Sequence, residues 1–404
     1  CQCIARRFDI DFVSDLVAED EDENVKPPMK KAARRSSSGK QKSEESSAFQ
    51  ALDMLEMQDV PVGQGRSGDS QEAMDAKGYE AELAGRLGRF EGAYDDVNVG
   101  RPGQIIGPHG DESGATRLLH GRYQELAKKK EGKVTLVVMA SCQDAADFVL
   151  KYEDLFASQT ERVIVQGGAD GIVLLENSTF VELPPGQFEA AVATYSEKRY
   201  VVRGNAKDSN IKFDELSAQS FISTVQRRGI PLVFVSKFAA YGAAIRKEVF
   251  ESFRGHGPMG DRLANGVQSS IEGLWKVVNK KEEDPEWNPN FAARCNREWF
   301  FSTFCKDPAK NPRDKPLKWS PFSEMPDESK WTSIWPYVTH LNQYDSLAVI
   351  ASVPRLYHGF FRPSQLTPTG SVEQVGETEE KSGVADRTNL ENFMLTRFQA
   401  ALPQ

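Results

Sequence analysis

One stretch of the sequence raises the question of chemistry first: "HLNQYDSLAVIASVP", which runs from His340 to Pro354. Asp345 stands there between a tyrosine and a serine, directly before an apolar run that is typical of a buried helix. A carboxylate at this position can cap a helix that begins at Ser346. It can also point out of the sheet toward a group that needs a negative charge. The position alone leaves both interpretations open.

Other polar residues gather beside predicted strands. The strand "VTLVVM" is followed by "ASCQD", "VIVQGG" by Ala169 and Asp170, and "YVVRG" by "NAKDSN". Arg66 follows "VPVGQG", and "GPHGDESG", with His109 and Asp111, precedes a predicted helix. Ligands of open parallel sheets bind beyond the carboxyl ends of the strands. We therefore expect these five polar clusters to meet at one edge of a sheet.

Alternating strand and helix patterns predict the fold that must position these residues. The run "KVTLVVMAS" has a continuous apolar centre, which is typical of a strand buried on both faces of a parallel sheet, and "RVIVQGG" and "IPLVFVSK" are also predicted strands. Helical spacing of apolar residues occurs in "GATRLLHGRYQELAKKK", in "QDAADFVLKYEDLFAS", and in "DELSAQSFISTVQRRG" with Asp214 as its N-cap. This alternation predicts an α/β fold with an open, mostly parallel β-sheet flanked by helices.

Composition divides the chain into parts. Acidic, basic and serine-rich runs in residues 1–48 cannot bury enough apolar surface to become ordered, so we expect a disordered charged insertion there. Residues 49–363 carry the alternating pattern, with a helical and aromatic insertion at 264–333. Residues 364–404 read as a polar tail with a helical pattern near its end. The chain begins with Cys1 rather than Met, so we expect a fragment or a gene model without its true start.

Charge, hydropathy and cysteine spacing argue against several classes of protein. A formal net charge of −9 disfavours nucleic acid as a partner, because phosphate contacts need a basic face. No run of about 18 apolar residues and no signal-peptide core appears, which disfavours a membrane partner and predicts a cytoplasmic protein. The five cysteines lack metal-type spacing, so reduced thiols are expected. The glycine-rich segments match neither dinucleotide-binding nor phosphate-binding loops.

Several blocks of the sequence resemble the inosine-uridine preferring nucleoside hydrolases, in the divergent branch of fungi and protists. "VTLVVMASCQDAADFVLKY" is similar to that family's strand, "GPLTN" turn and helix, and "ERVIVQGGAD" to its "RIVIMGGA". "KDSNIKFDELSAQSFISTVQRRGIPLVFVS" resembles the segment that begins "AEFNIYVDPEAA", and "SIWPYVTHLNQYDSLAVIASVP" is similar to "WPYLTKLNMYDPLALLASVP". These blocks follow the family's order over most of residues 49–363. The resemblance implies a nucleoside hydrolase-like fold.

The resemblance also implies a site for one Ca²⁺ and a ribose. The implied calcium ligands are Asp345, the backbone carbonyl of Met139, Asp11 and Asp15. The implied catalytic residues are Asp9, which would activate the attacking water, and Tyr344. The implied substrate contacts are Asn205, Asp208, Asn210, Gln166 under the sugar, and His109 at the rim.

Two departures from the family pattern bear on catalysis. The stretch "DIDFVSDL" matches the family's "DTDPGxDD" incompletely, since Leu16 stands in place of the last aspartate and the Pro-Gly turn is missing. Three aspartates in an acidic N-terminus can also be a coincidence. Tyr344 stands where simpler family members have a histidine acid, and a tyrosine with a pKa of about 10 is a weaker acid at neutral pH. Either another group protonates the leaving base, or aromatic contacts such as Trp299, Phe300 and Trp335 activate it.

The function that the resemblance implies is hydrolysis of the N-glycosidic bond of an inosine- or uridine-type ribonucleoside. A Ca²⁺-activated water would attack through an oxocarbenium-like transition state. The alternative is a catalytically impaired relative that binds a ligand or another protein. A truncated gene model of an active enzyme would explain the incomplete first motif equally well. Family members are often homodimers or homotetramers, and nothing in the sequence decides between these.

Overall fold

The computed structural model describes most of the chain from Gly114 onward and a few residues before it. The described residues are 61–63, 65, 105–106, 109, 112–130, 132–176, 179–182, 200–212, 214–280, 282–283, 295–305, 333–367 and 369–402. The predicted insertion at 1–48 lies outside them, and so do Asp9, Asp11, Asp15, Arg66 and Asp111. The expectations for these residues stay predictions.

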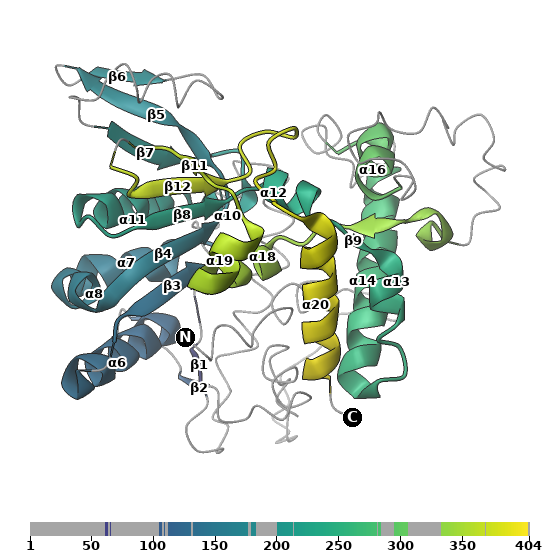
Figure 1. Cartoon of the computed structure of the whole chain (residues 1–404), viewed down its shortest axis with the longest axis horizontal. Coiled ribbons are helices and arrows are strands. Elements are labelled where there is room, and N and C mark those ends of the chain that lie inside the picture. Colours follow the sequence, from purple (N-terminus) through teal and green to yellow (C-terminus); the bar gives the residue numbers. More distant parts are fainter. Residues whose placement is uncertain are drawn as a thin grey trace, which may run out of the picture.

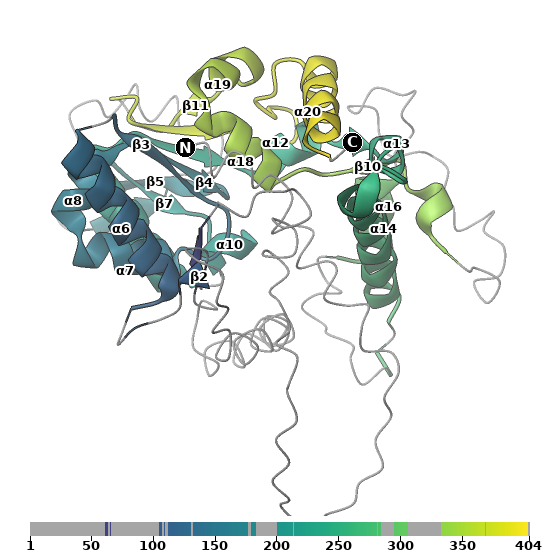
Figure 2. The same ribbon diagram turned by 90° about the horizontal axis from the view of Figure 1, so that it is seen from below.

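The main sheet has five strands in the order β11-β12-β8-β4-β3. Its four parallel strands are β3 (Val134–Val138), β4 (Thr160–Gln166), β8 (Leu232–Val235) and β12 (Val372–Val375). The edge strand β11 (Ser364–Gln365) runs antiparallel to β12. Helices cover both faces of this sheet (Figures 1 and 2). The predicted fold class, an α/β protein with an open and mostly parallel sheet flanked by helices, is therefore confirmed.

Side chains of the central strands alternate between two cores, as the period of two in a strand requires. In β4, Val163 and Val165 lie in one core, and Ile164 lies in the other. The helices on the first face are α6 (Gly114–Lys129), α7 (Gln143–Lys151), α8 (Glu153–Gln159) and α11 (Glu215–Arg227). The second face is covered by α18 (Asp345–Ser352) and α19 (Pro354–Phe360). Burial on both faces explains why the strands are apolar throughout.

Two helix boundaries can be compared with their sequence signals. The predicted N-cap Asp214 is confirmed, because its carboxylate accepts a hydrogen bond from the Ser217 amide at 3.0 Å. The segment "QDAADFVLKYEDLFAS" forms two helices, α7 and α8, and not the single helix that its spacing predicts. The backbone at Tyr152 leaves the helical region, with φ −129° and ψ 41°.

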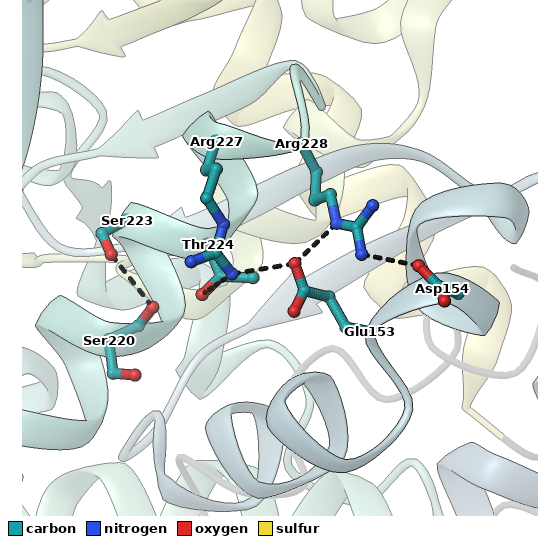
Figure 3. Close-up of polar contacts among 7 residues, drawn as sticks. All are labelled: Glu153, Asp154, Ser220, Ser223, Thr224, Arg227 and Arg228. Atoms are coloured by element: carbon teal, nitrogen blue, oxygen red, sulfur yellow. Dashed lines mark hydrogen bonds and ion pairs between the residues drawn. The ribbon is translucent and has the colours of Figure 1, made fainter.

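A surface network joins the N-terminus of α8 to the C-terminus of α11 (Figure 3). Arg228 binds Glu153 and Asp154, each at 2.6 Å, and Arg227 binds Glu153 at 2.8 Å. Hydrogen bonds from Arg228 and then Arg227 lower the pKa of Glu153. Exposed ion pairs of this kind contribute little to stability, so the apolar core on the first face holds these two helices in place.

A second sheet was not predicted. It is antiparallel, with strand order β6-β5-β7, and its strands are β5 (Ala169–Glu176), β6 (Thr179–Glu182) and β7 (Tyr200–Gly204). The run "YVVRG" is therefore a strand, but it is not part of the main sheet. A parallel neighbour of β4 needs a crossover of a dozen or more residues, whereas β5 begins only three positions after β4 ends.

The helical part of the molecule lies beside the main sheet (Figure 1). Its helices are α13 (Lys247–Glu251), α14 (Gly257–Val278), α16 (Arg297–Phe304) and α20 (Arg387–Ala401). The last of these is the helix expected near the end of the chain, whereas β12 is a strand that the polar composition of residues 364–404 did not predict. Val372 and Val375 are buried in β12, and the strand pairs with β8 along its whole length.

The remaining elements are short. They are β1 (Val62–Gly63), β2 (Ile105–Ile106), α10 (Ser209–Lys212), α12 (Lys237–Gly242), β9 (Ile245–Arg246), the 3₁₀ helix η2 (Trp335–Tyr337) and β10 (His340–Leu341). β1 pairs with β2, and β10 pairs with β9, outside the main sheet. Over the described ranges, every helix is too short or too polar to span a lipid bilayer.

Candidate functional site

The carboxyl ends of the parallel strands form one edge of the main sheet. Met139 follows β3, Gln166 ends β4, Ser236 follows β8 and Gly376 follows β12. The loop after β7 also reaches this edge, because the Asn205 amide donates to the Gly168 carbonyl at 2.8 Å. The contacts at this edge therefore join two of the expected polar clusters, those after β4 and β7, even though β7 belongs to another sheet.

Asn210 connects the ends of β3 and β4. Its side-chain nitrogen donates to the Met139 carbonyl at 3.0 Å and to the Gln166 carbonyl at 3.3 Å. The same nitrogen also contacts the Gln166 side-chain oxygen. These contacts use the donor end of the amide, so Asn210 Oδ1 is the end that can accept from a ligand hydroxyl.

Asp208 contacts the turn that follows β4. Its Oδ2 accepts from the Gly168 amide at 2.5 Å, and its Oδ1 lies 3.7 Å from Lys237 Nζ. The Asp208 side chain is 11% exposed and that of Lys237 is 38% exposed, so the pair is partly buried. Asn205 Oδ1 accepts from the Lys207 amide at 2.8 Å and thereby shapes the loop that carries Asp208.

The turn Gly167–Ala169 is the backbone part of this site. Gly167 has φ +147°, a conformation that a residue with a Cβ rarely adopts. A Cβ on Gly168 would lie 2.8 Å from Asp208 Oδ2 and 3.6 Å from the Ser236 Cβ. The two glycines therefore allow the turn to bend sharply and allow the Asp208 carboxylate to approach its backbone.

Tyr344 and Asp345 lie at the start of α18, which packs against β3 and β4. The Tyr344 hydroxyl is hydrogen-bonded to that of Tyr241, and Asn342 Nδ2 donates to it at 3.5 Å. Burial raises the pKa of Tyr344, and the neighbouring Tyr241 adds to this effect. Burial raises the pKa of Tyr241 as well.

Asp345 is the first residue of α18, and Tyr344 occupies the N-cap position without a side-chain capping bond. The interpretation of Asp345 as the cap of a helix that begins at Ser346 is therefore wrong by one residue. A carboxylate in the first helical turn is still favoured by the helix dipole. The side chain is neither buried nor fully exposed.

The aromatic residues proposed to activate a leaving base lie in the second core. Phe300 is fully buried beside Trp275, and Trp299 packs edge-on against Phe304. Trp335 is buried and donates its indole N–H to Glu251 at 2.8 Å. These contacts are those of core residues.

A second meeting of polar clusters lies at the N-termini of α6 and α7. Ser113 Oγ donates to Asp144 Oδ1 at 2.5 Å, and a Cβ on Gly65 would lie 2.7 Å from Asp144 Oδ2. His109 is exposed, and its backbone pairs with that of Glu112. In the part of the chain that the structure describes, the contacts that join Asn210, Asp208 and Gln166 do not include His109.

The described residues do not form a calcium site by themselves. They contain no group of three or more His, Cys, Asp or Glu side chains that could hold a metal ion. Of the implied ligands they include Asp345 and the Met139 carbonyl, and that carbonyl already accepts a hydrogen bond from Asn210. Ca²⁺ takes six to eight oxygen ligands. The expectation of calcium therefore depends on Asp11 and Asp15, which lie outside the described residues.

Three residues at this edge were missed by the sequence analysis: Lys237, Tyr241 and Gln374. Lys237 stands two positions after the end of β8, so a listing of the first residues after every strand finds it. Tyr241 lies one helical turn later on α12. Gln374 is 4% exposed, and its Oε1 accepts from the Ala169 amide at 2.6 Å. No local pattern marks Gln374, because the strand that carries it, "VEQV", has only two apolar residues.

Comparison with known proteins finds similarity in structure only. The type III effector protein XopQ, solved in complex with adenosine diphosphate ribose, superposes with a TM-score of 0.57 at 22% identity over 87% of this chain and 78% of the effector. The effector protein XOO4466 gives 0.56 at 22% identity over the same shares. A purine-preferring ribonucleoside hydrolase from Gardnerella vaginalis gives 0.39 at 11% identity over 74% of this chain and 69% of the hydrolase, too low to carry an argument.

No protein-family model matches the chain, and no curated protein does. The two effector structures show that this chain shares their fold. At this level of identity the fold is all that the likeness shows.

Proposed function

We propose that the chain binds a small molecule that contains a ribose, at the carboxyl edge of the main sheet. The observation that carries this proposal is the convergence of Gln166, Asp208 and Asn210 on the turn after β4. Two neighbouring hydroxyls of a ribose can donate to a carboxylate and an amide oxygen, and Asp208 and Asn210 carry such groups two positions apart in the chain. The sequence resemblance assigns the same three residues to the sugar, which supports the proposal independently of the contacts.

The chemistry of binding follows from the hydrogen-bond partners. The Gly168 amide fixes the Asp208 carboxylate, and the Met139 and Gln166 carbonyls fix the Asn210 amide. Both groups are thus oriented before a ligand arrives, and less conformational entropy is lost on binding. Hydrogen bonds to a carboxylate are stronger than those to neutral groups. Asp208 is accordingly the residue expected to contribute most to affinity.

Calorimetric titration tests this proposal. Adenosine and adenosine diphosphate ribose are suitable ligands, the second because a protein of the same fold was solved with it. The full chain should bind at least one of them, and Asp208→Asn should weaken that binding about tenfold or more, equivalent to about 1.4 kcal/mol or more. Asparagine still accepts from the Gly168 amide, so the fold should persist. Equal affinity of the two proteins would contradict the proposal.

A second candidate function is hydrolysis of the N-ribosyl bond of such a ligand. It is favoured by the position of Tyr344 and Asp345 at the start of α18, which packs against β3 and β4. Asp208 and Asp345 are carboxylates that could stabilise a ribosyl cation electrostatically. Tyr344 and Tyr241 retain their protons because burial raises both pKa values, so neither is a strong acid for the leaving base.

Chromatographic measurement of free base from inosine and uridine tests the hydrolase proposal. We expect slow release that depends on added Ca²⁺ and is lost in Asp345→Ala, while adenosine affinity changes less. Calorimetric binding of Ca²⁺ should disappear in the same variant. If the full chain binds a ribonucleoside but releases no base with Ca²⁺ present, the ligand-binding proposal stands without the hydrolysis.

A further inference from the structure

We propose that Gln374, in the C-terminal strand β12, is a positioning residue for the ribose site. The proposal rests on the proposed function, because it concerns the same site. Gln374 lies in a segment whose composition marked it only as a polar tail. It is separated from β4 by β8, which stands between the two strands in the sheet. Its side chain nevertheless reaches the turn that follows β4.

Both ends of the Gln374 amide are hydrogen-bonded. Oε1 accepts from the Ala169 amide at 2.6 Å, and Nε2 donates to the Gly376 carbonyl at 3.0 Å. The Gly376 carbonyl also accepts from Ser236 Oγ at 2.5 Å. A buried amide with both ends paired fixes the backbone groups that it contacts, because breaking either bond leaves a polar group without a partner.

Each of the three backbone amides of the turn 167–169 donates a hydrogen bond to a different segment of the chain. The Gly167 amide donates to Val235 of β8 at 2.9 Å, the Gly168 amide donates to Asp208, and the Ala169 amide donates to Gln374. The Gly168 carbonyl in addition accepts from the Asn205 amide. Ala169, which Gln374 holds, is the next residue in the chain after Gly168, and the Gly168 amide orients Asp208. Loss of its hydrogen bond frees Ala169, and displacement of Gly168 then moves the ribose-site carboxylate.

Glutamine is suited to this role because it accepts and donates at the same time. In Gln374→Glu, the introduced carboxylate can accept from the Ala169 amide, but it meets the Gly376 carbonyl as a second acceptor. Burial beside a carbonyl raises the pKa of an introduced carboxyl. At low pH the protonated acid can donate to Gly376 while its other oxygen accepts from Ala169. The variant should therefore regain the native contacts as the pH falls.

Neighbouring Glu373 provides a matched control. Its side chain points to the other face of β12, where its Oε2 accepts from the Tyr357 hydroxyl at 2.7 Å. Glu373→Gln keeps an acceptor for that hydroxyl and changes the strand at the adjacent position. It should leave the ribose site unchanged.

Titration of the full chain with adenosine diphosphate ribose at pH 8 and pH 5.5 measures the effect on the site. Gln374→Ala should bind about tenfold more weakly than the wild type at both values of pH. Gln374→Glu should bind as weakly at pH 8 and approach the wild-type affinity at pH 5.5, whereas Glu373→Gln should match the wild type throughout. The proposal would be overturned if Gln374→Ala bound the ligand with wild-type affinity. It would also be overturned if the affinity of Gln374→Glu, relative to the wild type, did not recover at pH 5.5.

Amide hydrogen exchange without ligand separates this proposal from the proposed function. In Gln374→Ala, exchange should accelerate at residues 167–169 and 205–208, with the rest of the main sheet unchanged. Unaltered exchange there would overturn the positioning role, whatever the ligand. Accelerated exchange in a wild-type fold that binds no ribose-containing ligand would instead contradict the proposed function and leave the structural link intact.

Discussion

Gly168 is the residue at which the backbone of the sheet meets the candidate ligand site. Its amide holds Asp208, and a Cβ at this position would meet the Asp208 carboxylate at 2.8 Å. In Gly168→Ala the carboxylate must move, although no backbone atom blocks the methyl group. We expect ligand affinity to fall about tenfold with little change in thermal stability. Calorimetry and thermal unfolding, followed by circular dichroism, measure the two effects.

Gly121→Ala serves as the comparison for that variant. Gly121 lies in α6, and a Cβ there would meet nothing within 4 Å. An alanine inside a helix is favoured over glycine by about 1 kcal/mol. Stability should rise slightly and affinity should not change. If Gly168→Ala behaved in the same way, Asp208 would not be a ligand contact.

The position of Lys237 leads to a prediction about the charge of the ligand. Its ammonium group lies 3.7 Å from Asp208 and is partly exposed, so it can approach a negatively charged group of a ligand that contacts Asp208. Lys237→Gln should therefore weaken the binding of adenosine diphosphate ribose more than the binding of adenosine. Comparison of the two ligands in one calorimetric series measures the difference. An equal loss for both would mean that Lys237 only balances the charge of Asp208.

At the residue scale, the sequence predicts part of the site. Resemblance blocks identify Met139, Gln166, Asp208 and Asn210. Asn210 is hydrogen-bonded to Met139 and Gln166, and Asp208 to the turn after β4. Gln374 could not be found in this way, because its role depends on the pairing of β12 with β8 and on a side-chain hydrogen bond to Ala169, which is far away in the sequence. Such a pairing leaves no local periodicity in the sequence.

At the scale of elements, Tyr123 provides a test of how α6 is anchored to the rest of the fold. Tyr123 is buried against Phe148 and Phe156, and its hydroxyl is 3.1 Å from Thr160 Oγ1. Burial raises its pKa from 10.0 to about 12. Because the folded pKa is the higher one, this group stabilises the fold fully below pH 10. That contribution is lost as the pH rises from 10 to 12.

Tyr123→Phe should remove this pH dependence. At pH 8 the variant loses one hydrogen bond and should be less stable by about 1 kcal/mol. At pH 11 ionisation of this tyrosine should have lowered the free energy of unfolding of the wild type by about 1 kcal/mol. The difference in free energy of unfolding between the two proteins should therefore become smaller. Urea unfolding at the two pH values gives both free energies of unfolding. A constant difference would show that the unfolded and folded pKa values are alike.

The elements also show where periodicity succeeds and fails. The apolar strands β4 and β8 and the helix α11 are long or strongly patterned, and the sequence predicts them. The sequence does not predict β12, because "VEQV" has only two apolar residues, nor the antiparallel pairing of β5 with β7. Whether a strand joins the main sheet depends on the connection before it.

At the scale of the whole molecule, the C-terminal segment joins the sheet to the helical part. α20 lies between α19 and α13 (Figures 1 and 2). Phe393 packs on Phe360 of α19, and Phe398 packs edge-on against Phe253. Truncation after Pro363 removes these contacts together with β12. Burial of each large apolar side chain contributes about 1.5–3 kcal/mol, so the loss should exceed the stability of an ordinary domain.

The truncated chain is therefore expected to be unfolded, as measured by near-ultraviolet circular dichroism and by rapid proteolysis. A chain that ends at Leu402 keeps β12 and α20 and should resist the protease as the full chain does. Cooperative unfolding of the chain truncated after Pro363 would show that the tail is an accessory to the fold.

A crystal structure of the full chain with adenosine diphosphate ribose tests the central claim most directly. The account predicts that the ribose lies at the carboxyl edge of the main sheet, with its hydroxyls within hydrogen-bonding distance of the Asp208 carboxylate and the Asn210 side-chain oxygen. A ligand bound elsewhere, or with its ribose turned away from Asp208, would contradict it.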